Sequence, residues 1–311
     1  MSSLLENSIK DMINNYDKVF FHKSNVIGVG LGVKNIKGMN TKEPCLHVLV
    51  KEKVPLNKLN KKDIVPSSFL GIKTDIINCG GFKLSGESPI TKINNINLKS
   101  RIRPIKPGIN IAAFNGEIGG TLGAIVFGNK KNTPYILSCN HILADNNELE
   151  VGEYIVQPEP PPDYYHNLVA FLSKAIRLDF EEKGINIVDA AIAEIPSYVK
   201  YTEEIPYIGK VKNIADPYIT MRVRKTGCVS GYTEGVIKTI NTKVRISNIY
   251  GEKLMFKDQI IASYMSEIGD SGSIVVDSYN NAIGLLMGLS KEYTIINPIT
   301  KILNYLNVHF N

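Results

Sequence analysis

The sequence contains no apolar run of the about 20 residues that a membrane-spanning helix requires. Its first residues, Met1–Asn7, are polar and acidic, whereas a secretory signal would be basic and then apolar. The 36 lysines and arginines outnumber the 30 acidic residues, but they are interleaved with Asn, Ile and Thr instead of clustered. We therefore expect a cytoplasmic protein that interacts with neither membranes nor nucleic acid.

The sequence also lacks the histidine and cysteine spacing of a metal site. None of its 5 histidines is paired at helical spacing. Its 4 cysteines are scattered and form no ligand motif: Cys45, Cys79, Cys139 and Cys228. We expect no metal, no cofactor and thiols that stay reduced, as in a reducing compartment. The run Gly28-Val29-Gly30-Leu31-Gly32 is not followed by a helix start, so it is not a dinucleotide fingerprint.

What the sequence does contain is a glycine-rich turn of the kind that exposes a serine. It reads Gly269-Asp270-Ser271-Gly272 and precedes the apolar run 274–276. A serine hydroxyl is a weak nucleophile, so it needs an exposed oxygen and backbone N–H groups aimed at the developing oxyanion. We interpret Ser271 as the candidate nucleophile. The N–H groups of Gly269 and Ser271 are the candidate oxyanion hole.

Two further residues stand in apolar surroundings upstream. His141 follows the apolar strand 135–138, and Asp189 interrupts the apolar segment 186–193. A nucleophilic serine needs a general base, and that base needs a group that fixes its tautomer. Singly, His141 could be a core histidine, Asp189 a cap and Ser271 an ordinary turn residue. If all three roles were only structural, the order of the residues and their local contexts would match a catalytic triad by coincidence at three positions. We therefore favour the catalytic interpretation.

The order of these residues resembles the trypsin-like serine peptidases of bacterial type. Three further blocks carry the resemblance, which covers about residues 105–307: Val223–Gly227, Ser230–Val236 and Asn297–Ile299. It implies a mainly β fold of two antiparallel six-stranded β-barrels with a C-terminal helix, preceded by a small α/β N-terminal domain. Barrel one would carry His141 and Asp189, and barrel two would carry Ser271.

The resemblance implies a serine endopeptidase that cleaves protein or peptide substrates through an acyl-enzyme. It places the floor of the substrate pocket near Met265 and a wall near Met287 and Gly288. Because no charged residue stands at that floor, we expect an uncharged, apolar residue before the scissile bond. Gln157–Asp163 could border the cleft or be a surface connection. Cys139 is a less favoured nucleophile than Ser271, since a strand cysteine is usually buried.

We divide the chain into residues 1–81, a small α/β domain that is regulatory or pro-domain-like, a linker 82–104, and a peptidase domain 105–311. The first part is expected to contain a helix over 3–16 and strands over 26–33, 46–50 and 72–79. In the first strand, the glycines would occupy one face and let another element approach closely.

Two alternatives to a constitutive enzyme remain open. One is a self-processing or latent protease that the N-terminal domain regulates, and the other is a catalytically inactive module with the peptidase fold. In the family, the residue before the nucleophile can pair with an N-terminus freed by cleavage. Here that residue is Asp270, and the bond Arg101–Ile102 would be the cleavage site. The sequence does not define an oligomeric state.

Overall fold

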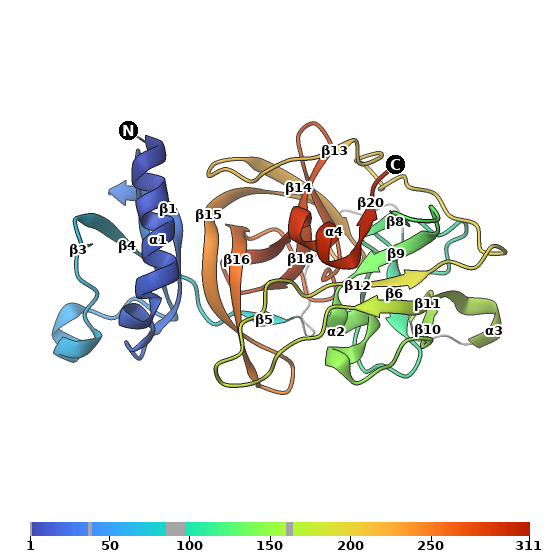
Figure 1. Ribbon diagram of the computed structural model, residues 1–311, viewed down its shortest axis with the longest axis horizontal. Coiled ribbons are helices and arrows are strands. Elements are labelled where there is room, and N and C mark those ends of the chain that lie inside the picture. Colours follow the sequence, from blue (N-terminus) through green and yellow to red (C-terminus); the bar gives the residue numbers. More distant parts are fainter. Residues whose placement is uncertain (1, 37–38, 85–96, 160–163) are drawn as a thin grey trace.

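A computed structural model describes residues 2–36, 39–84, 97–159 and 164–311 (Figure 1). It is mainly β, with strands gathered in two sheets of 12 and 8 strands. The predicted fold class is confirmed. Among the described residues, no helix is long and apolar enough to cross a membrane.

The larger sheet contains a closed six-stranded barrel, which we call barrel two. Its strands follow the order β14-β17-β18-β19-β16-β15, and a β14–β15 pairing closes the ring. The strands are β14 (Arg222–Gly227), β15 (Gly231–Ser247), β16 (Lys253–Ser263), β17 (Ile274–Asp277), β18 (Asn281–Leu289) and β19 (Tyr293–Pro298). Helix α4 (Ile299–Leu306) follows β19, as predicted for the C-terminus, and the short strands β13 (Asn213–Ile214) and β5 (Lys83–Leu84) pair with β18.

The smaller sheet forms the second lobe, barrel one. It has eight strands where six were expected, and no pairing among the described residues joins its two end strands. Its order is β20-β8-β9-β12-β11-β10-β6-β7. The strands are β6 (Asn110–Ala113), β7 (Gly119–Thr121), β8 (Ala124–Gly128), β9 (Pro134–Ser138), β10 (Tyr154–Val156), β11 (Leu168–Ala175), β12 (Ala191–Glu194) and β20 (Val308–His309). Along the chain, the short helix α2 (Asn140–Leu143) follows β9, and the short helix α3 (Tyr164–Asn167) follows β10. Figure 1 shows the two lobes side by side, with α4 near the junction.

The N-terminal unit has the predicted helix and strands. It consists of α1 (Ser2–Phe21), β1 (Val26–Ile36), β2 (Met39–Val50), β3 (Ser68–Phe69) and β4 (Ile72–Asn78). Its strands extend the sheet of barrel two, because β1 pairs antiparallel with β15. Figure 1 shows α1 against β1, on the side of β15 away from barrel one. The domain limits at residues 81 and 104 stay a prediction, and 85–96 of the expected linker lies outside the described residues.

The glycine face of β1 admits close neighbours, as expected. A Cβ on Gly30 would lie 2.5 Å from Thr239 of β15, and a Cβ on Gly32 would lie 2.0 Å from the His47 ring of β2. The opposite face carries Val29 and Leu31, which pack in an apolar cluster with residues of α1. Glycine at alternate positions thus brings three strands together on one face and leaves the other to bind the helix.

Replacing Gly32 by alanine should therefore destabilise the protein. The added Cβ meets a buried ring whose Nδ1 contacts Thr239 at 2.7 Å and whose Nε2 contacts the Val33 carbonyl at 3.0 Å, so the ring cannot easily move. Overpacking of this kind costs about 1–3 kcal/mol. Urea unfolding measures the loss. Gly81→Ala is the matched control, because nothing lies within 4 Å of its added Cβ; equal stability of the two variants would contradict this account.

Candidate active site

His141 and Asp189 form a buried hydrogen-bonded pair in barrel one. His141 lies in α2, directly after β9, and Asp189 lies two residues before β12. The His141 Nδ1 bonds to the Asp189 Oδ2, and the His141 backbone N–H donates to the Asp189 Oδ1 at 3.2 Å. The side chains are 1% and 0% exposed. The carboxylate therefore holds His141 at two points, the ring Nδ1 and the backbone N–H, and fixes the orientation of the imidazole.

Asn297 connects this pair to barrel two. Its side-chain oxygen accepts the Asp189 backbone N–H at 3.0 Å, and its Nδ2 donates to the Asp189 carbonyl at 3.2 Å. Asn297 precedes Pro298, which caps α4. The sequence pattern of this stretch predicted only the terminal helix, not the contacts of the Asn297 side chain. A polar residue between the apolar residues of a buried strand was the available signal.

The loop that carries Ser271 belongs to barrel two and docks on barrel one. Thr121 of β7 donates its N–H to the Ser271 carbonyl at 2.8 Å and its hydroxyl to the Gly269 carbonyl at 2.9 Å. A Cβ on Gly272 would lie 2.1 Å from the Ser138 hydroxyl, three residues before His141. The backbone at Gly272 has φ of +89°, which favours glycine. These contacts hold the Ser271 loop against β7 and against the end of β9, which His141 follows.

The Ser271 hydroxyl itself lies beside β18. It donates to the Met287 carbonyl at 3.0 Å, and Ser271 is fully buried. The predicted wall residues Met287 and Gly288 are thus adjacent to the candidate nucleophile. Met265, the predicted pocket floor, packs in a core cluster with other residues of barrel two. The preference for an apolar residue before the scissile bond stays a prediction.

Asp270 is held by a buried ion pair with Lys225 of β14. The Lys225 Nζ lies 2.8 Å from the Asp270 Oδ2, and both side chains are 0% exposed. The carboxylate also accepts the N–H groups of Glu267, Val229 and Ser230 at 2.8, 3.0 and 3.0 Å. Burial alone would raise the pKa of Asp270, but the Lys225 charge and these hydrogen bonds hold the pKa below its usual range.

Lys225 is the main residue that sequence reasoning missed. It shares the inward face of β14 with buried Val223, so the alternation of the strand was a signal that Lys225 faces the interior. Its ammonium already pairs with the carboxylate that a freed N-terminus would bind in the cleavage hypothesis. The residues of the suggested cleavage site have other partners, because the Ile102 N–H donates to the Gln157 side chain at 3.1 Å. Cleavage is therefore not needed to pair Asp270.

A cavity of about 250 Å³ lies beside the candidate oxyanion hole. Its lining includes Ile268 and Gly269 from the serine loop, Glu117 and Ile118 from barrel one, and Glu159. Glu159 belongs to the segment 157–163 that was expected to border the cleft or form a surface connection. This residue does lie at the cavity, whereas 160–163 lie outside the described residues.

The cysteines behave as buried thiols. Cys139 lies two residues before His141, but its thiol is fully buried and donates to the Leu286 carbonyl at 3.3 Å. Burial and then the charge of Asp189 raise the pKa of Cys139, which suppresses the reactive thiolate. The other three cysteines are also buried and unpaired.

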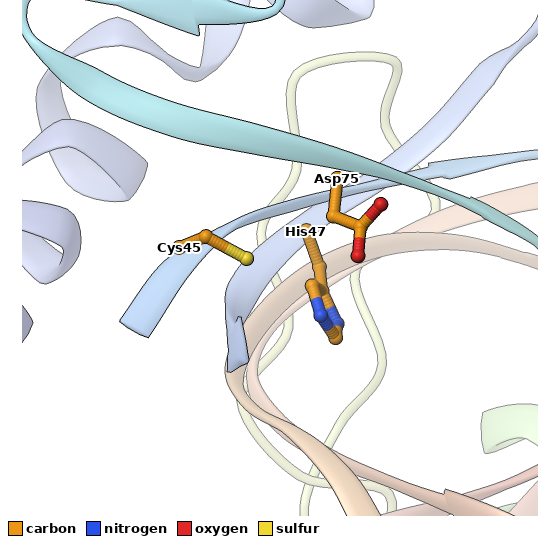
Figure 2. A group of neighbouring side chains, drawn as sticks. All are labelled: Cys45, His47 and Asp75. Atoms are coloured by element: carbon orange, nitrogen blue, oxygen red, sulfur yellow. The ribbon is translucent and has the colours of Figure 1, made fainter. Parts of the chain in front are cut away.

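In the N-terminal unit, three residues of the types that bind metals are neighbours: Cys45, His47 and Asp75 (Figure 2). Both ring nitrogens of His47 already have protein partners, Thr239 and Val33. Asp75 accepts from Lys34 at 3.2 Å and from the Asn35 N–H at 2.8 Å. Burial raises the pKa of the Cys45 thiol to about 12. Since these donors are engaged and a cation already neutralises Asp75, we interpret the group as a hydrogen-bonded bridge to β15.

Comparisons with known proteins place this architecture. Neither a model of a protein family nor a curated protein matches the chain. Among solved structures, Thermobifida fusca protease A is similar at a TM-score of 0.50 and 16% identity, with 66% of this chain and 97% of that chain covered. Nocardiopsis protease gives 0.49 and 17%, covering 67% and 98%. A glutamic acid-specific serine protease gives 0.48 and 17%, covering 67% and 100%. The chain has the trypsin-like fold of bacterial serine proteases.

Replacing Lys225 by methionine should leave the buried Asp270 carboxylate without a positively charged partner. Removing one partner of a buried ion pair costs about 3–5 kcal/mol. The loss should be largest near neutral pH and should shrink as the pH falls toward 4. Without the Lys225 charge, the folded-state pKa of Asp270 rises above that in the wild type, so the difference in stability shrinks as the carboxyl becomes protonated at low pH. Unfolding by urea at several pH values measures this.

The exposed pair Lys210–Glu203, at 3.4 Å, provides the control. Lys210→Met should change the free energy of unfolding by less than about 1 kcal/mol at every pH. A Lys225→Met variant that matches this control at neutral pH would show that Asp270 does not depend on the ion pair.

Proposed function

We propose that this chain is a serine endopeptidase in which Ser271 is the nucleophile, His141 the general base and Asp189 the residue that orients the base. The main support for this proposal is the hydrogen bonding of the two ring nitrogens of His141. Its Nδ1 bonds to Asp189, while its Nε2 is buried and has no hydrogen-bond partner among the described residues. An unpaired buried nitrogen costs about 1–3 kcal/mol, so its retention calls for a functional explanation.

The chemistry of the pair makes that nitrogen basic. Asp189 accepts the Nδ1–H, so the neutral ring carries its free lone pair on Nε2. A proton taken up at Nε2 creates an imidazolium next to a buried carboxylate, which stabilises the positive charge. Ser271 is the serine whose loop docks on the strands beside His141. These features support His141 as a base for the Ser271 hydroxyl.

The reaction then requires the Ser271 side chain to change its hydrogen-bond partner. The Ser271 hydroxyl would turn from the Met287 carbonyl toward the His141 Nε2, exchanging one hydrogen bond for another. As the Ser271 oxygen bonds to the acyl carbon, Nε2 takes its proton and then gives it to the leaving amine. Water attacks the resulting ester with the same base. The products are the two halves of the cleaved peptide.

The oxyanion would be held by the backbone N–H groups of Gly269 and Ser271. Loss of one such donor typically lowers the turnover by a factor of about 10²–10³. The ion pair of Asp270 with Lys225 supports the loop between these donors. The Lys225 ammonium provides the positive charge beside Asp270 that, in the cleavage hypothesis, a new N-terminus would provide. A complete donor pair can therefore exist in the uncleaved chain.

Protein or peptide substrates follow from the strand beside Ser271. β18 runs past the nucleophile, and β17 pairs with it only as far as Leu285. Beyond that point, one side of β18 is an edge that could bind extended polypeptide through its main chain, largely independent of sequence. Met287 of this strand contacts Ser271 directly, because its carbonyl accepts the hydrogen bond of the Ser271 hydroxyl. The protein needs no cofactor for this chemistry, since every proton is carried by His141.

A fluorophosphonate should form a single covalent adduct with the protein, and Ser271→Ala should abolish it. Intact-mass measurement after prolonged incubation detects the adduct. Ser273→Ala is the matched control, because Ser273 is a buried serine of the same loop whose hydroxyl donates to the Asp270 carbonyl at 2.6 Å. It should still be labelled. A folded wild-type protein that gives no adduct, even after prolonged exposure, would favour a binding module without activity.

A further inference from the structure

A short strand of the chain itself lies against β18 beside Ser271. β5 pairs antiparallel with β18, so that Leu84 is opposite Gly288 and Lys83 is opposite Leu289. Met287, the preceding residue of β18, accepts the hydrogen bond of the Ser271 hydroxyl. The pairing therefore begins one residue from the acceptor that the candidate nucleophile uses. This is the edge on which a peptide substrate would pair.

Gly288 is in close contact with this strand. A Cβ at Gly288 would lie 2.5 Å from the Lys83 carbonyl oxygen and 3.5 Å from the Leu84 Cα. Glycine at such a site lets another backbone approach closely. The space that Gly288 opens beside Ser271 is thus filled by the backbone of residues 83 and 84, and a second peptide cannot occupy it at the same time.

Two apolar side chains anchor the segment. Phe82 and Leu84 are each 2% exposed and share an apolar cluster with Met287 of β18 and Leu178 of barrel one. The Phe82 carbonyl accepts the N–H of Ser247, at the end of β15, at 3.1 Å. Lys83, between the two, is exposed. The alternation of buried, exposed and buried residues is that of a strand seated in a groove.

The catalytic groups are closed off in the same state. Ser271 is 0% and His141 is 1% exposed, so no polypeptide can reach them without a rearrangement. Lys99 lines the cavity beside Gly269. Leu84 thus lies beside β18, and Lys99 lies beside the candidate oxyanion hole.

We infer that Phe82–Leu84 is a built-in pseudosubstrate that holds the peptidase latent. The inference rests on the proposed function and adds a regulation to the same site. The segment occupies the edge of β18 through main-chain pairing, and Leu84 fills the apolar position next to Met287. A substrate has to displace it, and does so best with an apolar side chain in the place of Leu84. The exposed Lys83 makes the intervening position tolerant of any residue.

Leu84→Asp should release the segment, because a carboxylate cannot remain in the apolar cluster. Labelling of Ser271 by a fluorophosphonate should become at least about tenfold faster in the full-length variant, as expected for the loss of one buried leucine side chain. Hydrogen exchange of a peptide covering residues 286–290 should also become faster. Leu84→Ala should change both quantities in the same direction by less. Lys83→Glu alters only an exposed side chain of the same strand and should change neither.

These two measurements separate the inference from the proposed function. Rapid labelling of the wild type, at the rate of Leu84→Asp, would overturn the inference and leave the function in place. Unchanged exchange at residues 286–290 in a folded Leu84→Asp or Leu84→Ala protein would also overturn it. Absence of labelling in every variant, with faster exchange in Leu84→Asp, would instead contradict the nucleophilic role of Ser271 and leave nothing for the segment to inhibit.

Discussion

The buried ion pair between Lys225 and Asp270 is the interaction on which the site depends. Two full charges in the interior would be costly alone, and each is compensated by the other and by hydrogen bonds from the loop around them. Because Asp270 directly precedes Ser271, its fixed position also sets the direction of the neighbouring peptide groups. The same pairing lets the serine loop be ordered in an uncut chain, so restraint on activity has to come from somewhere other than an unformed loop.

The second constraint is that the site is divided between two barrels. His141 and Asp189 come from one sheet and Ser271 from the other, so a small shift between the lobes would separate them. Asn297 bonds to both backbone groups of Asp189, and Thr121 bonds to both carbonyls of the serine loop that face it. These contacts are directional, unlike the apolar core, and therefore fix the position of the lobes more closely than burial alone would.

Local sequence patterns predicted the secondary-structure elements and the candidate site residues. They did not predict most of the long-range contacts between those elements. The alternation of β1 with its glycine face and the helical spacing after Pro298 both correspond to observed elements. The pairing of His141 with Asp189 was likewise expected from their order and context. Lys225 and Asn297 were missed because their partners are distant in sequence. Closure of barrel two brings Lys225 to Asp270, and the packing of the two lobes brings Asn297 to Asp189. β5 has two residues, too few for any periodic signal, and exists because β18 and β15 lie on either side of it.

The N-terminal unit gains a physical role from this arrangement. Its β1 is hydrogen-bonded to β15, and β4 leads directly into Cys79, whose N–H bonds to the Val50 carbonyl. Phe82–Leu84 is therefore delivered to β18 from a rigid base. A tethered segment acts at an effective concentration of about millimolar or more, so even a weakly binding strand stays in place. Burial of Phe82 and Leu84 adds about 1.5–3 kcal/mol for each side chain, which favours the occupied state further. In the proposed latent state, the segment is released when the tether is cut or when the N-terminal sheet moves, and neither event changes His141, Asp189 or Ser271.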